Sequence, residues 1–361
     1  MRLLYWLLAF VPIAFYLEYS RASPASIFVS AGLAILPLAG LLGNATERLA
    51  ARTNSTVGGL LNATFGNASE LIIAFFALEA GKFGVVKASI SGSIIGNLLL
   101  VLGMALFMGG LRHTTQTFNA RTAQVTASLL TISVIAFMVP ALFDFTERTL
   151  GVESSAIRVD DARLALGVAI VLIILYTANL VFTLVTHSDL LSTADETHET
   201  GGEAASPFAA LSTLVVATVL VAFMAEFLVG SLEGFTRAVG LSEYFVGIII
   251  IPIVGNAAEH AAAVLFAMKG KMDLAVTIAL GSTIQVALLV GPLLVVLSFL
   301  IGKPMDLVLH NPLELVTLAG AVLIANSVAR DGETNWLEGL MLLGVYLIVA
   351  TAFFFLPSVS S

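Results

Sequence analysis

The segment Asn62-Ala-Thr-Phe-Gly-Asn-Ala-Ser-Glu70 runs directly into the apolar stretch Leu71–Leu78. It places a carboxylate inside an otherwise apolar region, with asparagines, hydroxyls and a glycine on the preceding turns. Ionised carboxylates are costly in hydrocarbon and commonly mark an ion or proton pathway where they occur there. The arrangement returns as Gly255-Asn-Ala-Ala-Glu259, again between apolar runs. Two glutamates in matching Gly-Asn-x-x-Glu frames predict one site built from two halves.

The composition is that of a membrane protein. Of the 361 residues, 58% are hydrophobic and 11% are charged, and the mean hydropathy is +1.02, which ordinary soluble domains do not approach. The chain has no cysteine, which excludes disulfides and thiolate metal sites, and its net charge of −8 argues against a nucleic-acid partner. No nucleophile–base pair and no cofactor motif is visible. The sequence therefore predicts a lipid-embedded protein that is not an enzyme and needs no cofactor.

Hydropathy predicts about eleven transmembrane helices, since many runs reach the roughly 20 apolar residues that cross a bilayer. The first run follows Arg2 in the manner of a signal peptide, but it lacks a clear small-residue cleavage site, so we interpret it as a retained helix. The predicted spans are Leu3–Tyr19, Ile27–Ala50, Val57–Leu78, Val85–Phe107, Thr122–Phe143, Leu164–Val185, Phe208–Leu232, Phe245–Met268, Leu274–Ile301, Leu313–Val328 and Trp336–Phe355.

An internal repeat sets the organisation of the chain. An offset of 189 residues superposes the two motifs and the segments around them without a gap: Val57-Gly58 falls on Val246-Gly247, Gly66-Asn67 on Gly255-Asn256, Glu70 on Glu259, and Gly92-Ser93 on Gly281-Ser282. Glu47 and Glu226 correspond if the second half has about ten extra residues upstream of its motif. The repeat unit is then five spans. An odd number inverts the second unit in the membrane, as in many secondary transporters that work by alternating access.

The predicted fold class is therefore an all-α polytopic membrane protein with one N-terminal helix and two inverted five-helix repeats. The predicted boundaries are 1–25 for the N-terminal helix, 26–188 for the first repeat, 189–206 for an acidic linker and 207–361 for the second repeat. The linker is interpreted as a solvated segment, with a cation-attracting or gating role as the alternative; its acidic residues are Asp189, Asp195, Glu196, Glu199 and Glu203. Basic residues are divided equally between the two sides, so charge bias does not decide the orientation.

The candidate cation ligands are all oxygen donors. Residues three and four apart share a helix face, so Asn67 lies with Glu70, and Asn256 lies with Glu259. Hard cations such as calcium take six to eight oxygens, whereas softer metals call for Cys or clustered His. Further candidates for the ion pathway are Glu47, Glu226, Asn62, Ser93, Asn97, Ser282, Gln285 and His260. Of these, His260 lies about 100° round the helix from Glu259, which favours packing or support over ligation.

The same carboxylates predict coupling to protons. Burial and mutual repulsion both favour the protonated form of a glutamate. An empty site therefore holds protons, and a dication displaces them. Since binding of one excludes the other, the pair meets the thermodynamic requirement for exchange.

Two other interpretations remain open at this stage. Asparagines, serines and small residues in membrane helices often serve only to hold helices together. A channel could use the same glutamates as a selectivity ring. A channel conducts without a proton gradient, whereas an exchanger does not, so a flux measurement separates the two.

The paired motifs resemble those of the calcium/cation antiporter superfamily. The first signature matches Gly66-Asn67-Ala68-Ser69-Glu70-Leu71 followed by Gly92–Leu99, and the second matches Gly255–His260 followed by Gly281–Gln285. His260 after the second glutamate, and the lack of proline before either one, resemble the cation/proton exchanger branch. A sodium/calcium or potassium-dependent exchanger of the same superfamily is the alternative. Position 96 departs from the pattern, because it is glycine where the family pattern has serine.

The resemblance implies eleven helices, Ca²⁺ as the main substrate and H⁺ as the counter-ion. It implies that Glu70 and Glu259 bind cation and protons in turn, and that Glu47 and Glu226 line the path. It also implies a prokaryotic-type inner membrane location with the acidic linker in the cytoplasm. A homo-oligomer is compatible with all of this.

Overall fold

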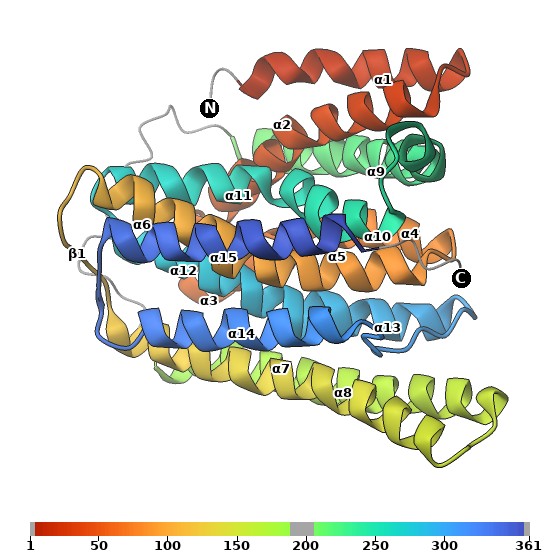
Figure 1. The fold of residues 1–361 in the computed structure, drawn as a ribbon. Helices are drawn as coiled ribbons and strands as arrows, with labels where there is room; N and C mark the ends of the chain where they lie inside the picture. Colours follow the sequence, from red (N-terminus) through yellow and green to blue (C-terminus); the bar gives the residue numbers. More distant parts are fainter. Residues whose placement is uncertain (1–3, 188–205, 357–361) are drawn as a thin grey trace. The chain divides into compact units, whose positions relative to one another are not determined.

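The structure is a computed structural model that describes residues 4–187 and 206–356, and these residues are nearly all helical (Figure 1). The acidic residues of the predicted linker, from Asp189 to Glu203, lie outside the described residues. The chain divides into two compact units. The first draws on Met1–Phe76, Thr177–Gly240 and Val254–Ala258, and the second on Ala77–Tyr176, Leu241–Ile253 and Glu259–Ser361.

Within the described residues, eight helices are long and apolar enough to cross a membrane. They are α2 (Pro24–Ala50); α5 (Phe83–Ile95) continued by η2 (Gly96–Val101) and α6 (Leu102–Gly110); α7 (Ala120–Thr149); α8 (Ser154–Val181) continued by η3 (Phe182–Thr186); α9 (Pro207–Val239); α10 (Glu243–Phe245) continued by η5 (Val246–Ile250) and α11 (Ile251–Met268); α12 (Met272–Gln285) continued by η6 (Val286–Val290) and α13 (Gly291–Leu300); and α15 (Trp336–Phe354).

Three shorter apolar segments complete the predicted set of eleven. The first is η1 (Leu4–Ala9) with α1 (Phe10–Tyr19), and the second is α14 (Pro312–Val328). The third is an interrupted helix made of α3 (Ser55–Phe65) and α4 (Ala68–Glu79). The prediction of an all-helical polytopic membrane protein is confirmed, although the third span is broken where a continuous helix was expected.

Several helices begin where the sequence provides a cap followed by proline. The side chains of Ser23, Ser206 and Asn311 each accept a hydrogen bond from a backbone N–H in the first turn of α2, α9 and α14. A proline follows each of these residues. A capping oxygen accepts a hydrogen bond from one of the free N–H groups of the first turn. Proline at the first helical position has no N–H group that would need an acceptor. These starts therefore follow from local sequence alone.

In the first unit, α2 and α9 pack side by side and antiparallel (Figure 1). Pro24, at the start of α2, lies against Gly234, near the end of α9. Phe28 stacks on Phe235 with ring centroids 4.0 Å apart. The two helices are the first helices of the two predicted repeats, and their opposite direction is what an inverted repeat requires.

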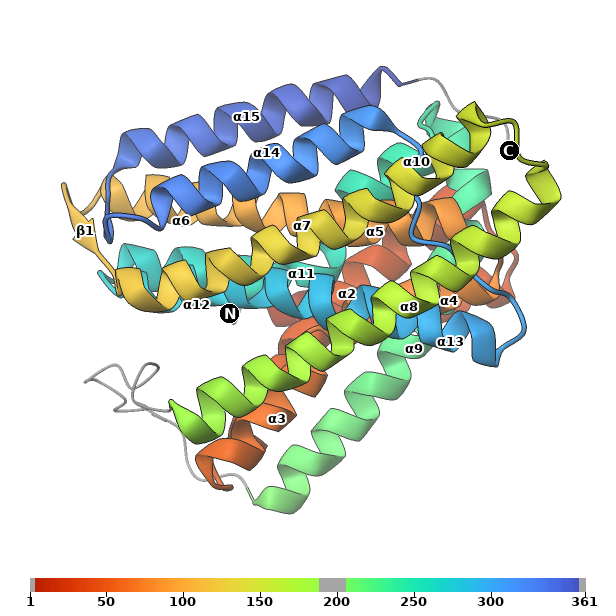
Figure 2. The same ribbon diagram turned by 90° about the horizontal axis from the view of Figure 1, so that it is seen from below.

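In the second unit, α5 packs closely against η5. A Cβ atom on Gly92 would lie 2.1 Å from the carbonyl oxygen of Ile248, so only glycine permits this approach. The same unit places α15 beside α6 and α14 beside α7 (Figure 2). The helix running from Phe83 to Gly110 is the most buried of the membrane helices, since 83% of an 18-residue apolar stretch within it is buried in the protein.

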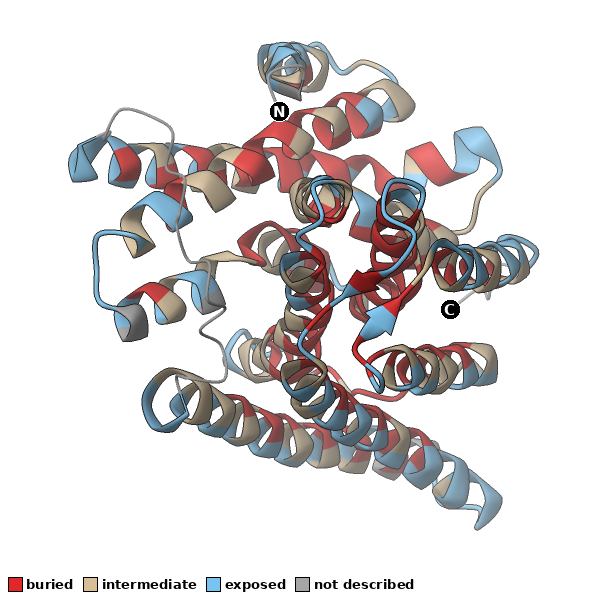
Figure 3. Ribbon diagram, turned by 90° about the vertical axis from the view of Figure 1, so that its left-hand side faces the viewer, coloured by how far each residue is buried: buried red, intermediate tan, exposed pale blue. Residues whose placement is uncertain are grey.

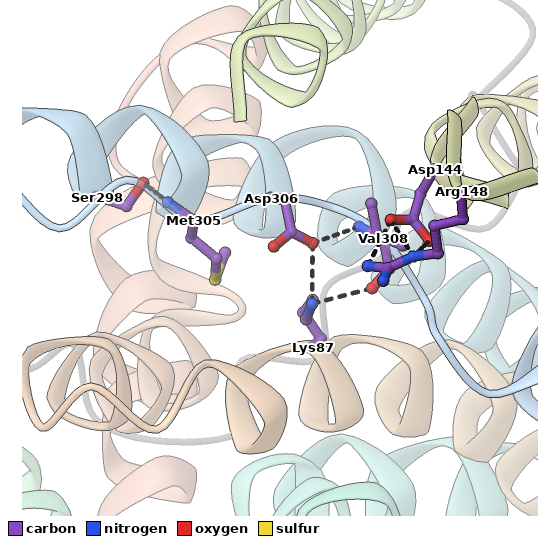
Figure 4. A network of polar contacts seen from close by, with 7 residues as sticks. All are labelled: Lys87, Asp144, Arg148, Ser298, Met305, Asp306 and Val308. Atoms are coloured by element: carbon purple, nitrogen blue, oxygen red, sulfur yellow. Dashed lines mark hydrogen bonds and ion pairs between the residues drawn. The ribbon is translucent and has the colours of Figure 1, made fainter. Parts of the chain in front are cut away.

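The two ends of that long helix are secured in different ways. After α6, the strand β1 (Gln116–Thr117) pairs antiparallel with β2 (Glu333–Thr334) from the connection between α14 and α15. At the start of α5, Lys82 forms an ion pair with Glu243. Lys87 contacts both Asp306 and the carbonyl oxygen of Val308 at 2.9 Å (Figure 4).

The apolar surface of α8 is largely exposed, because only 17% of an 18-residue apolar stretch in the helix it forms with η3 is buried. Ile170, Val171 and Ile174 are among its exposed residues. In Figure 3 the exposed residues are coloured pale blue, and they occur along many of the helices. Large exposed apolar residues along a membrane-length helix indicate a lipid-facing surface.

Candidate cation-binding site

The first motif lies where the third membrane helix is interrupted. The helix α3 ends at Phe65, and α4 begins at Ala68, so Gly66 and Asn67 form the break. Glu70 then falls in the first turn of α4. The N-terminus of a helix carries partial positive charge, which favours a carboxylate at this position. Glu70 and Asn67 are both buried.

The two motifs meet in the first unit. The amide Nδ2 of Asn256 donates a hydrogen bond to Oε1 of Glu70. The neighbouring residue, Gly255, lets the two segments approach, since a Cβ atom there would lie 3.0 Å from Cγ of Glu70. A hydrogen bond to a buried carboxylate is roughly twice as strong as a neutral one. The predicted ligand Asn256 therefore contacts the predicted ligand Glu70 across 186 residues of sequence.

A second pair of predicted residues meets within the second unit. Nδ2 of Asn97 donates to Oγ of Ser282 at 3.2 Å, and both side chains are buried. Ser93, on the same helix as Asn97, is buried, and Gln285 is half-buried. This pair again joins one residue from each predicted repeat.

Next to these residues the backbone forms π-helical turns that the sequence did not predict. They are η2 in the first repeat and η6 in the second, and the offset of 189 residues places them at matching positions. A π-helical turn shifts the hydrogen-bond register by one residue and is frequent at functional sites. The repeat symmetry therefore extends to this π-helical turn, although the break at Gly66 and Asn67 has no counterpart in the continuous helix α11.

The remaining predicted residues differ in exposure. In the second unit, Glu259 is half-buried, and His260 is buried. Nε2 of His260 forms no hydrogen bond to any described residue. In the first unit Glu47, Asn62 and Glu226 are exposed.

Each of the two pairs offers carboxylate, amide or hydroxyl oxygens, which suit hard cations. In the described part of the chain, no group of three or more His, Cys, Asp or Glu side chains is arranged to hold a metal ion.

Residues 23–185 and 209–355 match the family described as sodium/calcium exchanger protein. The chain belongs to this family. The predicted relationship to the calcium/cation antiporters is thereby confirmed.

Relatives of this exchanger align over nearly their whole length. A protein of Aphanothece halophytica named Ca²⁺/H⁺ antiporter is 46% identical over 366 residues, covering 98% of this chain and 96% of the relative. A protein of Bacillus subtilis named Ca²⁺/H⁺ antiporter ChaA is 43% identical and covers 92% and 93%. The crystal structure of the Ca²⁺/H⁺ antiporter protein YfkE is similar with a TM-score of 0.83 and 39% identity, covering 99% of this chain and all of that one.

Proposed function

We propose that this exchanger moves Ca²⁺ and H⁺ in opposite directions across a membrane by alternating access. The names and high identity of its relatives support this assignment. The structural observation that carries it is the hydrogen bond from Asn256 to the buried carboxylate of Glu70. It joins the two signature motifs at one titratable group, as a site shared between two inverted repeats requires.

In this proposal Glu70 and Glu259 bind the cation, and the same two carboxylates bind protons when the cation has left. Asn67 and Asn256 supply amide oxygens. The amide of Asn256 donates through its nitrogen to Oε1 of Glu70. Rotation of that amide would present its oxygen to an arriving cation, so one side chain can serve both states.

Exchange follows from charge. Two carboxylates match the charge of one dication, whereas the empty pair in a poorly solvated region is stabilised by protons. Calcium and protons therefore compete for the same oxygens. A carrier that moves only when its site is neutralised then exchanges one for the other.

The remaining predicted residues form the approach to the site in this proposal. Glu47, Asn62 and Glu226 attract cations from water, which fits their exposure. Ser93, Asn97, Ser282 and Gln285 are polar positions along the inner path, and His260 supports the helix that carries Glu259.

We infer that the transported ions are the only small partners and that no resident cofactor takes part. The exposed apolar helices suit a lipid environment, which we propose to be a prokaryotic-type inner membrane with the acidic linker on the cytoplasmic side. A homo-oligomer remains compatible with this proposal.

The test is calcium flux into proteoliposomes that contain the purified full chain. An outward-directed proton gradient should drive uptake in chloride buffers free of sodium and potassium, and a sodium or potassium gradient at equal pH should not. Uptake driven by sodium alone would assign the chain to sodium/calcium exchange. Passive calcium flux that needs no counter-ion gradient would indicate a channel.

A further inference from the structure

A buried carboxylate outside the two motifs lies in the second unit. Glu314 occupies the first turn of α14 and is 2% exposed. The hydroxyl of Tyr244, in α10, donates to its Oε2 at 2.7 Å. Oε1 has no hydrogen-bond partner among the described residues, and the Ser91 hydroxyl of α5 is the other polar neighbour.

No cation neutralises this carboxylate within the described residues. The charge of Lys87 acts on it, but the ammonium group of this lysine is already held by Asp306 and the Val308 carbonyl (Figure 4). Among the described residues, Tyr244 and Lys87 are the titratable groups that act on Glu314. An ionised carboxylate buried without a paired charge is strongly unfavourable, whereas a neutral carboxyl group is not.

We propose that Glu314 is a proton-binding site of this exchanger, distinct from Glu70 and Glu259, whose proton enters the transport cycle. The proton is on Oε1, the oxygen without a partner, while Oε2 accepts from Tyr244. On release, the O–H bond of the carboxyl group breaks, and the proton passes to water at the nearby start of α14. The remaining carboxylate is stabilised by the hydroxyls of Tyr244 and Ser91 and by the charge of Lys87.

The surroundings couple this group to the helices of the candidate site. Ser91 is on α5, which also carries Ser93 and continues into η2, which carries Asn97. Tyr244 leads directly into η5, which contacts α5 at Gly92 with no room for a side chain. A change of protonation at Glu314 therefore alters hydrogen bonds to both of these tightly packed helices.

The first test is infrared difference spectroscopy of the purified full chain during titration from acid to alkaline pH. The proposal expects a carbonyl band of a protonated carboxyl group that is absent in Glu314→Gln. The glutamine keeps a carbonyl oxygen that can accept the hydrogen bond from Tyr244, so this substitution should preserve the fold. Glu243→Gln is the matched control, because that neighbouring carboxylate is paired with Lys82, and the band should persist in it.

The second test is proton release on calcium binding in weakly buffered solution. Glu314→Gln should release fewer protons per chain than the wild type, by about one at most, with a flatter dependence on pH. Tyr244→Phe keeps the carboxyl group but removes a donor to the ionised form, so release should move to higher pH.

An unchanged carbonyl band in Glu314→Gln would overturn the proposal, and so would unchanged proton release. If Glu314→Gln fails to fold, an unshifted profile in Tyr244→Phe overturns it instead. The infrared result does not depend on calcium transport, so it stands or fails separately from the assignment of Glu70 and Glu259.

Discussion

At the scale of the residue, the bond between Asn256 and Glu70 predicts distinct losses for its two partners. Glu70→Gln should abolish exchange in a folded protein, because it removes half the proposed charge and one protonatable group. Glu259→Gln should do the same. Asn256→Ala should bind calcium roughly 10- to 100-fold more weakly, since it removes a proposed ligand oxygen and a polar contact to a charged group contributes about 1.5–3 kcal/mol. Calcium titration and flux in proteoliposomes measure both effects.

Asn326→Ala provides the matched control for this series. Its amide also bonds across helices, to Thr131 at 2.9 Å, but outside the motifs. Its calcium affinity should equal that of the wild type. Near-normal transport by Glu70→Gln would remove that residue from the proposed site.

Sequence alone indicated Glu70 and Asn256 as candidates because duplication separates them from accidental polar residues. Glu314 has no such duplicate, since the offset of 189 residues places it on Val125. An acidic residue in the first turn of a helix is also common for reasons of dipole and capping. Its burial beside Tyr244 depends on tertiary packing, which no local pattern records.

At the scale of the element, the contact of α5 with η5 predicts which glycine cannot be replaced. Gly92→Ala should destabilise the protein by about 1–3 kcal/mol or more, because the added methyl group meets a backbone carbonyl that cannot rotate away. Gly84→Ala is the control on the same helix. A Cβ atom there meets nothing within 4 Å, so stability should be unchanged or slightly higher.

Thermal unfolding in detergent measures both glycine variants. Equal midpoints for Gly92→Ala and the wild type would contradict the close approach of the two helices. Activity need not be measured for this comparison, which tests packing alone.

Hydropathy predicted the helices well, because the bilayer demands a fixed length of apolar chain. It did not predict the break at Gly66 and Asn67 or the π-helical turns η2 and η6. These irregularities lie within apolar helices whose residues all permit a regular helix. Their hydrogen-bond register is set by neighbouring helices, so it is visible only in the folded chain.

At the scale of the whole molecule, the antiparallel pair α2 and α9 predicts access from two sides. The contacts of Pro24 with Gly234 and of Phe28 with Phe235 fix the register of the pair. In that register, Glu47 and Glu226 are separated along the helix axis by about 12 residues, or about 18 Å. Cysteines at these two positions should react with membrane-impermeant thiol reagents from opposite sides.

The wild-type chain is the control for this labelling, because it contains no cysteine and should not react. Each variant is labelled in sealed vesicles from outside, and again after permeabilisation. Modification of both positions from the same side would contradict the inverted topology.

The two ends of the long helix from Phe83 to Gly110 have a consequence for its response to ionic strength. Ion pairs of Lys82 and Lys87 hold one end, and partly exposed ion pairs weaken as dissolved salt screens them. Backbone hydrogen bonds between β1 and β2 hold the other end, and salt screens these far less. A high salt concentration on the side of Lys82 and Lys87 should therefore weaken the contacts at that end of the helix. The same concentration on the other side of the membrane should leave the pairing of β1 with β2 intact.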